Sequence, residues 1–597
     1  MLSLSTLEVF FTWVVAATTL IGLGSLLLSR FTKNFFLADA FWMGLAISVA
    51  LLEIWNIVFP VTASITLFLF CAGILGLALN RFSLLTSWRT AWQRSRWLLL
   101  LGIAFTLLLA LRSCAPCEHY DTGLYGAPVV RWMQTYPAVP GLANLHGRFG
   151  FNSSVFLCIA ALGQGPWKNL GFHLFTGFML SAMWVTLLPA CARVIGRLPT
   201  SPANWFYSIL ALPAFFWTVR SRIVGTQTDE PATVVCLIAA GILFEHFCQE
   251  DGRDQPKTHT SRLILATTLF SLAVAFKLST IVFALLAWCF AFRGIWLLGR
   301  SARQRTKYLF ATLALSSLIL LPWCARGIIL SGYPFYPATV VAFPVAWKVP
   351  LSAARWYALG VQSWGRIPDT PFRDTQGIHW LGGWLNHALR NRPSFQVPVA
   401  ISLAGLFVAL ISRFRKKHHP ACPWLSLLFP SIVGIIFWFV ASPDLRFAQF
   451  AIWTMAATLG VWGIVSLDLQ LHRSHTNLVL AALVLSSIWC LISFGWNEPL
   501  LALRGVQQPP PLPKPALILQ HTLSGLAVYV PAQGDQCWDA PLPCTAYFDQ
   551  SLRLRNSSSL RWGFTSEGRA AEFSDFMISH RCNSIGAAVI LPLEHSF

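Results

Sequence analysis

The feature that most constrains this chain is a series of apolar runs, each roughly 16 to 24 residues long, separated mostly by short polar connections. A helix rises 1.5 Å per residue, so a run of about 20 residues crosses a hydrocarbon core about 30 Å thick. Hydrophobic residues make up 55% of the chain and charged residues only 11%, against about 25% in soluble domains. A water-soluble globule is therefore excluded. Membrane β-barrels show short alternating segments instead, so we expect an all-α polytopic membrane protein.

The apolar runs predict about fourteen membrane-spanning helices. The segments are 8–28, 36–58, 61–79, 97–111, 171–192, 204–219, 230–248, 263–276, 279–293, 308–325, 396–412, 424–441, 446–466 and 476–494. The stretch 263–293 is also compatible with a broken pair of helices or with one long helix. The resulting regions are N-terminal helices at 1–111, a first loop at 112–170, helices at 171–325, a second loop at 326–395, helices at 396–494 and a C-terminal tail at 495–597.

The distribution of basic residues predicts the orientation. The net charge is +20, from 43 Lys and Arg against 23 Asp and Glu. Short connections on one side hold 21 Lys and Arg, whereas those on the other side hold only Arg220, Arg222, Lys277 and Arg446. Because Lys and Arg accumulate in cytoplasmic loops, the two long loops and the tail are expected to face outward. We expect an integral protein of a bacterial inner (plasma) membrane, with lipid rather than nucleic acid as its partner.

The tail is predicted to be a small outward-facing α/β unit. The proline-rich stretch QPPPLPKP at 508–515 cannot continue a helix and reads as a spacer. The runs GLAVYVP and AAVILP read as short strands. Cys537 and Cys544 are expected to form a disulfide, which an extracytoplasmic location permits.

Charged residues gather where the helices reach the outer boundary. They are Glu118, Asp121, Arg220, Arg222, Asp229, Glu230, Lys277, Arg326, Asp444 and Arg446. The simple explanation is that a charge deeper in the membrane costs about 2.5–3.5 kcal/mol on insertion scales. The alternative is that these residues converge on one outward-facing site, which would explain why acids and bases occur together in short motifs.

The segment SCAPCEHYDTGLY follows the fourth predicted helix and offers the first candidate residues. Asp121 is the first choice for a general base, because a carboxyl held beside apolar surface can have a raised pKa. Glu118 and His119 are candidate supporting groups. In the alternative interpretation, Asp121 only caps an amphipathic helix at 124–136 that lies flat in the membrane interface.

Cys114, Cys117 and His119 could also be metal ligands. A fourth ligand at zinc-finger spacing is missing, so a local disulfide or free thiols are favoured over zinc.

Two further groups of charges complete the candidate site. Asp229 and Glu230 precede Pro231, a pattern that also simply favours a helix start. Lys277 lies alone in an apolar run and requires an anionic partner, for which a phosphate, Asp121 or Asp229 would serve.

Arginines of two later segments suit phosphate, because a guanidinium makes bidentate charge-assisted hydrogen bonds. Arg326 ends a predicted helix in PWCARGIILSGYPFYP, where it could equally anchor the chain at the headgroups. Asp444 and Arg446 share the tight turn SPDLRF.

The motifs HYDTGLY, TDEP, FKLS, PWCARGIILSGYPFYP and PDLRF resemble short motifs at corresponding places in the GT-C superfamily of membrane glycosyltransferases, which use polyprenyl-phosphate-linked sugars. The architecture, with many helices, a long first loop opening with a carboxylate and a soluble tail, is also similar. HYDTGLY with NLHGRFGFNSS, and GDQCWDAPLPCT in the tail, resemble an uncharacterised bacterial family of large membrane proteins.

The resemblance implies a GT-C-like fold and assigns roles to several positions. Asp121 matches the catalytic carboxylate of the first loop, Asp229 or Glu230 a second acid, and Lys277, Arg326 and Arg446 the surroundings of the donor phosphate. Asp444 supports Arg446. Three extra helices precede the first-loop carboxylate, and the chain has no D-x-D metal motif. We therefore expect an inverting, metal-independent reaction without a cofactor, with a divalent metal as the alternative.

The expected function is transfer of a sugar from a polyprenyl-phosphate-linked donor to an acceptor hydroxyl of a glycan or lipid-linked molecule, on the extracytoplasmic face, in assembly of the cell envelope. Two alternatives use similar substrates: a transporter or flippase for a lipid-linked glycan, and a polymerase or ligase of the O-antigen type. Transporters often show internal repeats, and no repeat is evident in this sequence.

Overall fold

A computed structural model describes residues 4–32, 35–196, 198–219, 223–248, 256–299, 301–368, 370, 375–390, 393–415, 422–467, 485, 488 and 509–567, without the side chains of 91, 93–95, 256, 257 and 415. The helices are α1 Leu4–Leu28, α2 Leu37–Val58, α3 Ala63–Leu79, α4 Arg81–Arg112, α5 Ala127–Thr135, α6 Leu142–Leu145, α7 Val155–Leu162, α8 Phe175–Ile195, α9 Pro202–Val219, α10 Asp229–Cys248, α11 Pro256–Phe276, α12 Ile281–Leu298, α13 Ala302–Ser331, α14 Leu351–Arg366, α15 Trp380–Leu389, α16 Pro393–Arg415, α17 Leu428–Ala441 and α18 Gln449–Ser466. Short helical turns include η1 Thr122–Gly126, η2 Gly147–Gly150, η5 Leu278–Thr280 and η8 Leu445–Ala448.

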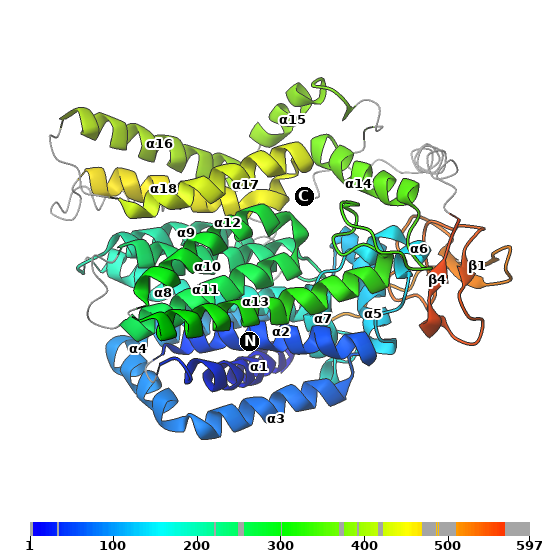
Figure 1. Ribbon diagram of the computed structural model, residues 1–597, viewed down its shortest axis with the longest axis horizontal. Coiled ribbons are helices and arrows are strands. Elements are labelled where there is room, and N and C mark those ends of the chain that lie inside the picture. The colour runs from blue at the N-terminus through cyan, green and yellow to red at the C-terminus, as the bar shows by residue number, and fades with distance from the viewer. Residues whose placement is uncertain are drawn as a thin grey trace.

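The long helices run side by side as one bundle, with α1–α3 on one flank and α16–α18 on the other (Figure 1). Within the described ranges, ten helices are long and apolar enough to cross a membrane, or up to eleven if the bent pair α3 and Arg81–Thr90 counts as one span. The chain is therefore a mostly helical integral membrane protein.

The predicted segments correspond to helices, with two differences in detail. The segment 97–111 is only the second half of α4, which begins at Arg81 and meets α3 at an angle of 78°. The segments 263–276 and 279–293 are two separate helices, α11 and α12, which turn at Lys277 and pack against each other. The last segment, 476–494, lies almost entirely outside the described residues, so the count of fourteen spans stays a prediction.

Helices α1, α2 and α3 approach one another at glycines. A Cβ atom on Gly44 of α2 would lie 1.8 Å from the carbonyl oxygen of Leu20 in α1, and one on Gly76 of α3 would lie 2.0 Å from that of Gly22. Small residues allow such close backbone contact, which drives association of helices in lipid.

Replacing Gly44 with alanine is therefore expected to destabilise the bundle, although alanine is the better helix former by about 1 kcal/mol. The backbone of α1 must move to admit the methyl group, and overpacking typically costs about 1–3 kcal/mol. Thermal unfolding of the detergent-purified protein measures the effect. The matched control is Gly102→Ala in α4, where the nearest atom to the new Cβ lies at 3.6 Å; an equal melting temperature for both variants would contradict the expectation.

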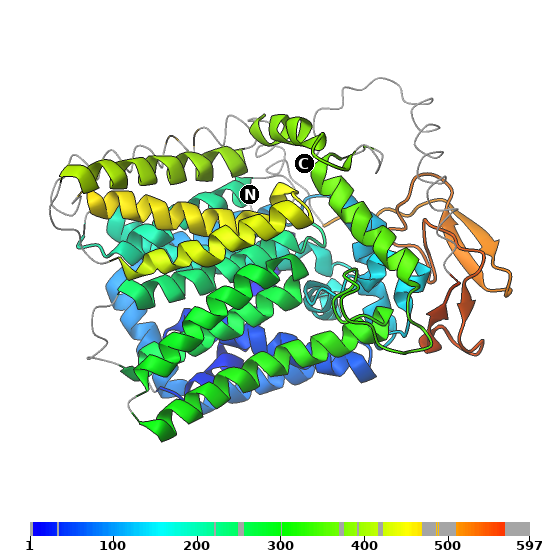
Figure 2. The same cartoon turned by 45° about the horizontal axis from the view of Figure 1, so that its top comes forward.

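The three long polar regions lie at one end of the bundle, which we call the loop end (Figures 1 and 2). Helices α14 and α15 of the second loop expose a set of apolar side chains, as helices resting on a lipid surface do. These side chains are Leu351, Leu359, Leu381, Leu385 and Leu389.

The segment 124–136 does not lie exposed in the interface, contrary to its amphipathic pattern. Its apolar side chains Val129, Trp132 and Met133 are buried, and the ring of Trp132 packs edge-on against Phe564 of the tail. The apolar face is covered by protein instead of lipid.

The opposite end of the bundle contains a cluster of largely buried charges. Arg262 of α11 pairs with Asp39 of α2 at 3.3 Å and with Glu245 of α10. This cluster, which we call the opposite-end triad, ties together three helices that are far apart in the sequence.

The described part of the tail contains two small antiparallel sheets. Strands β1 Leu517–His521 and β2 Ala527–Pro531 pair with each other, as do β3 Arg553–Leu554 and β4 Phe564–Thr565. The run GLAVYVP thus contains β2, whereas AAVILP lies outside the described residues. The structure joins Cys537 to Cys544 by a disulfide. The proline-rich stretch does not hold the tail apart from the membrane unit, because the Pro510 carbonyl accepts a hydrogen bond from His173 at 3.0 Å.

Candidate active site at the loop end

Five of the charged residues predicted at the outer boundary meet at the loop end. Lys277 pairs with Asp229, and Arg446 with Asp444 at 3.0 Å. Arg446 also lies 3.9 Å from a carboxylate oxygen of Asp121.

A sixth charged residue, Arg148, pairs with the other carboxylate oxygen of Asp121 at 3.4 Å. The six side chains are only 14% to 29% exposed, so their charges act on one another with little screening by water. The cluster therefore combines three carboxylates with three cations.

Breaks in the helices place these charges. Lys277 has an extended backbone between α11 and η5, so its ammonium group emerges at the turn and lies 4.1 Å from the ring centre of Phe447. Asp229 begins α10. Asp444 precedes η8, where its carboxylate accepts hydrogen bonds from the backbone N–H of Arg446 at 3.0 Å and from the guanidinium at 3.0 and 3.2 Å.

The threonine after Asp121 connects the first loop to the segment before α10. The Thr122 hydroxyl oxygen accepts a hydrogen bond from the backbone N–H of Thr226 at 2.9 Å. Gly225 allows this segment to approach Thr122, because a Cβ atom at position 225 would lie 2.7 Å from the Thr122 hydroxyl. The φ of Gly225 is +144°, which also favours glycine. The motif HYDTGLY is therefore in direct contact with the segment that immediately precedes TDEP.

The structure corrects two expectations about Asp121. Its side chain makes no capping hydrogen bond to the following turn, so it is not a helix cap. Burial raises the pKa of Asp121, but Arg148, followed by His119, Arg446 and Lys277, lowers it by more, so the pKa lies below 3.8 instead of being raised. Asp121 is therefore ionised at neutral pH.

Asp444 behaves similarly. Burial raises its pKa, but the charge and hydrogen bonds of Arg446 outweigh this and hold the pKa below its usual value. Both acids thus remain anions that can orient the guanidinium between them.

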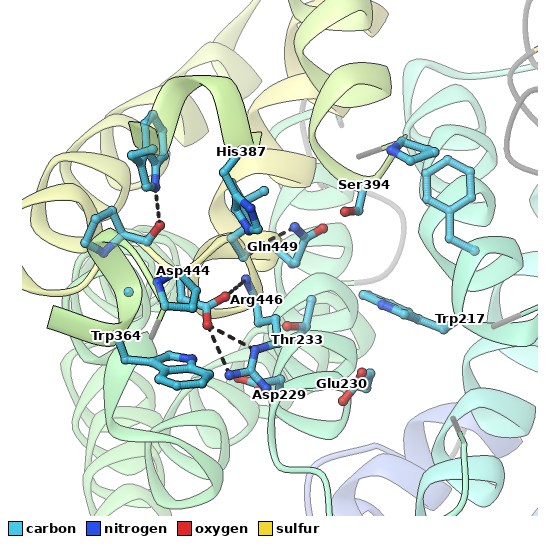
Figure 3. A pocket seen from close by; sticks show the side chains of 17 residues that line it. Trp217, Asp229, Glu230, Thr233, Trp364, His387, Ser394, Asp444, Arg446 and Gln449 are labelled. Atoms are coloured by element: carbon cyan, nitrogen blue, oxygen red, sulfur yellow. Dashed lines mark hydrogen bonds and ion pairs between the residues drawn. The ribbon is translucent and has the colours of Figure 1, made fainter. Parts of the chain in front are cut away.

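A cavity of about 110 Å³ adjoins this charge cluster (Figure 3). Carboxylates Asp229, Glu230 and Asp444, together with Arg446 and the side chains of His387 and Gln449, line its polar wall. Its aromatic lining consists of Phe216, Trp217, Trp364 and Trp384. In Figure 3, Trp217 and Glu230 lie across the cavity from Asp444 and Trp364, and Asp229 lies beside Arg446.

Arg220 and Arg222 lie outside the described residues, and the other predicted residues lie at varying distances from this cluster. Glu118 is exposed. The Nδ1 atom of His119 lies 3.1 Å from the Thr122 hydroxyl, within hydrogen-bond distance. Cys114 and Cys117 are free thiols, and among the described residues no three His, Cys, Asp or Glu side chains lie close enough to hold a metal ion.

Arg326 belongs to a separate, fully buried cluster. Helix α13 continues to Ser331, so Arg326 lies inside the helix and not at its end. Its guanidinium donates to the side-chain oxygen of Asn152 at 2.7 Å, and Ser154 nearby on the same loop donates to Glu53 of α2 at 2.5 Å. Arg326 does not line the cavity, and neither do Asp121 and Lys277. The predicted place of Arg326 near a donor phosphate stays a prediction.

Sequence reasoning missed several residues of the site. Arg148 lies within the motif NLHGRFGFNSS, yet nothing in its spacing relates it to Asp121. Trp364 and His387 come from α14 and α15, in a region for which the sequence predicts only a second loop.

The fold and the site define an integral membrane protein with a charged, partly enclosed centre at one end of its helices. The chain belongs to the family described as a domain of unknown function, DUF8201, whose model matches residues 7–453. That match includes all six charged residues of the cluster. No curated protein is similar enough in sequence to be matched.

One solved structure shows a low degree of similarity, that of the Archaeoglobus fulgidus oligosaccharyltransferase in the apo form. It is 14% identical, covers 70% of this chain and 57% of its own, and has a TM-score of 0.37. The chain thus spans little more than half the length of that enzyme. A TM-score of this size does not define a shared fold.

Proposed function

We propose that this protein is a membrane glycosyltransferase of GT-C type that transfers a sugar from a polyprenyl-phosphate-linked donor to an acceptor hydroxyl. The observation that carries the proposal is that Arg446 contacts both Asp121 and the cavity. A base for a hydroxyl, cations for a phosphate and an aromatic-lined cavity are therefore adjacent, at the end of a membrane bundle.

The cavity suits a sugar ring. Binding sites for small molecules combine apolar walls with a few placed polar groups, and Trp217 and Trp364 contribute two indole side chains to the lining. A carboxylate has about four lone-pair sites, so Asp229 and Asp444 can accept hydrogen bonds from sugar hydroxyls while they pair with Lys277 and Arg446.

In the proposed reaction, the acceptor oxygen attacks the anomeric carbon as the bond between that carbon and the donor phosphate oxygen breaks. Asp121 takes the hydroxyl proton, and the lipid phosphate leaves with the electron pair of the broken bond. Lys277 and Arg446 stabilise the growing negative charge on the phosphate, a form of electrostatic help that is often the largest catalytic contribution. One displacement inverts the anomeric configuration.

The low pKa of Asp121 fits this sequence of events. A phosphate that draws Arg446 toward itself weakens the contact of 3.9 Å between Arg446 and Asp121. Losing a nearby cation raises a carboxyl pKa. Donor binding would thus make Asp121 a stronger base at the moment when the acceptor arrives.

The test is transfer by purified protein in lipid nanodiscs. Synthetic polyprenyl-phosphate-linked hexoses are the donors and a cell-envelope extract is the acceptor, and mass spectrometry follows free polyprenyl phosphate and the glycosylated product. We expect at least one donor to be consumed. Binding of polyprenyl phosphate without consumption of any donor would favour the transporter alternative instead.

We further propose that the loop end faces outward, as the loop charges predict. Cysteines introduced at Gly360 of α14 and at the exposed Leu523 of the tail should then react with a membrane-impermeant maleimide in intact cells. A cysteine at Ala302, exposed at the opposite end, should react only after permeabilisation. Peptide mass spectrometry separates these positions from the native cysteines, and the reverse pattern would overturn the orientation.

A further inference from the structure

A short loop of the C-terminal tail is docked on the segment that carries Asp121. This loop, residues 535–544, which we call the tail loop, is closed by the disulfide between the buried residues Cys537 and Cys544. It lies more than 400 residues after Asp121 in the sequence, beyond the 7–453 region that matches the family model.

The tail loop holds the chain on both sides of Asp121. The side-chain amide of Gln536 donates to the carbonyl oxygen of Tyr120 at 2.8 Å, and the Tyr120 hydroxyl donates to Asp535. On the other side, the backbone N–H of Trp538 donates to the carbonyl oxygen of Gly123 at 3.0 Å. Asp121 and Thr122 thus lie between hydrogen bonds that connect both neighbouring residues to one disulfide-closed loop.

The Trp538 side chain fits closely against η1. A Cβ atom on Gly123 would lie 2.4 Å from the indole, so only glycine leaves room for this ring. Trp538 has φ +42°, an uncommon conformation for a bulky residue that persists only where the surroundings fix it.

A second anchor follows in the chain. Arg131 of α5 pairs with the Asp539 carboxylate at 2.8 Å and donates to the carbonyl oxygens of Asp539 and Ala540, each at 3.0 Å. The tail loop therefore contacts the turn before η1, η1 itself and α5.

We propose that the tail loop positions Asp121, with Trp538 as the central positioning residue; its catalytic consequence rests on the function proposed above. Asp121 makes no capping bond of its own and meets Arg446 only at 3.9 Å. A small shift of Tyr120–Gly123 would therefore change which cation Asp121 faces. Misplacing a catalytic group by about 1 Å can cost about a hundredfold in rate.

The first test measures hydrogen–deuterium exchange of the full-length protein in nanodiscs. In Trp538→Ala, and in the parent after reduction of the disulfide, amides of residues 119–126 should exchange at least tenfold faster, while those of α11 do not change. Trp562→Ala is the matched control, because Trp562 is an exposed tail tryptophan. If Trp538→Ala also unfolds β1 and β2, the test uses Gln536→Ala instead. That variant removes only the hydrogen bond to the Tyr120 carbonyl oxygen and leaves the disulfide in place. Unchanged exchange at 119–126 in these variants would overturn the proposal.

The second test separates positioning from general stability. Trp538→Ala should lower kcat about tenfold with KM for the donor within twofold, and Trp538→Phe should recover most of the loss. Faster exchange at 119–126 without any change in kcat would overturn the positioning role. A parent protein that transfers no sugar would overturn the proposed function instead, and exchange alone would then decide whether the tail loop holds this segment.

Discussion

Replacing Asp121 with asparagine is expected to lower turnover by about 10²–10⁴-fold, the usual contribution of a general base. Asparagine keeps the size of the side chain but cannot take the hydroxyl proton. The cations Lys277 and Arg446 remain, so polyprenyl phosphate should still bind. Transfer rate and lipid binding, measured on equal amounts of folded protein, check this expectation.

The matched control for this substitution is Glu567→Gln, an exposed carboxylate of the tail. Because the pKa of Asp121 lies below 3.8 in the absence of substrate, kcat/KM of the parent should stay flat as the pH falls from 7 to 5. Near-normal transfer by well-folded Asp121→Asn would move the base to Asp229 or Glu230.

Replacing Lys277 with methionine is expected to weaken binding of the lipid phosphate and to slow the chemical step together. A hydrogen bond to a charged group contributes about 1.5–3 kcal/mol, which corresponds to roughly ten- to a hundredfold in affinity. The same cation stabilises the leaving phosphate, so kcat should fall as well. Titration with polyprenyl phosphate and steady-state kinetics measure the two effects.

Lys277→Arg keeps the charge and should retain most of the binding. The substitution with methionine also removes the partner of Asp229, so the yield and melting temperature of each variant are needed for comparison. If Lys277→Met binds polyprenyl phosphate as well as the parent does, Lys277 is only the structural partner of Asp229.

Hydropathy and loop charge locate most of the candidate residues, because a charge at the end of an apolar run is costly inside the hydrocarbon core and therefore lies at the membrane boundary. Asp229, Lys277 and Arg446 are separated by up to 217 residues, yet all fall at one boundary once the spans are assigned. Their contacts, by contrast, depend on how α10, α11 and α18 are arranged around one another, which no local pattern encodes.

Arg326 and the segment 124–136 show where sequence reasoning fails. Hydropathy falls over residues 322–326 and so predicts a helix end at Arg326, whereas α13 continues to Ser331 and the buried guanidinium of Arg326 donates a hydrogen bond to Asn152. The apolar stripe at 124–136 correctly predicts that apolar groups cover this face of the helix. The stripe does not indicate whether lipid or protein supplies those groups. Part of its cover comes from the tail, more than 400 residues away, where Phe564 packs against Trp132.

The opposite-end triad has a consequence for how the molecule exchanges material with its surroundings. A protein that carries cargo through the bilayer by alternating access must open first at one end and then at the other. Separating α2, α10 and α11 would break the ion pairs of Arg262 with Asp39 and Glu245. Removing one partner of a buried ion pair costs about 3–5 kcal/mol. Helices α2, α10 and α11 are thus held together at this end of the bundle, and any motion that separates them there must first supply that free energy.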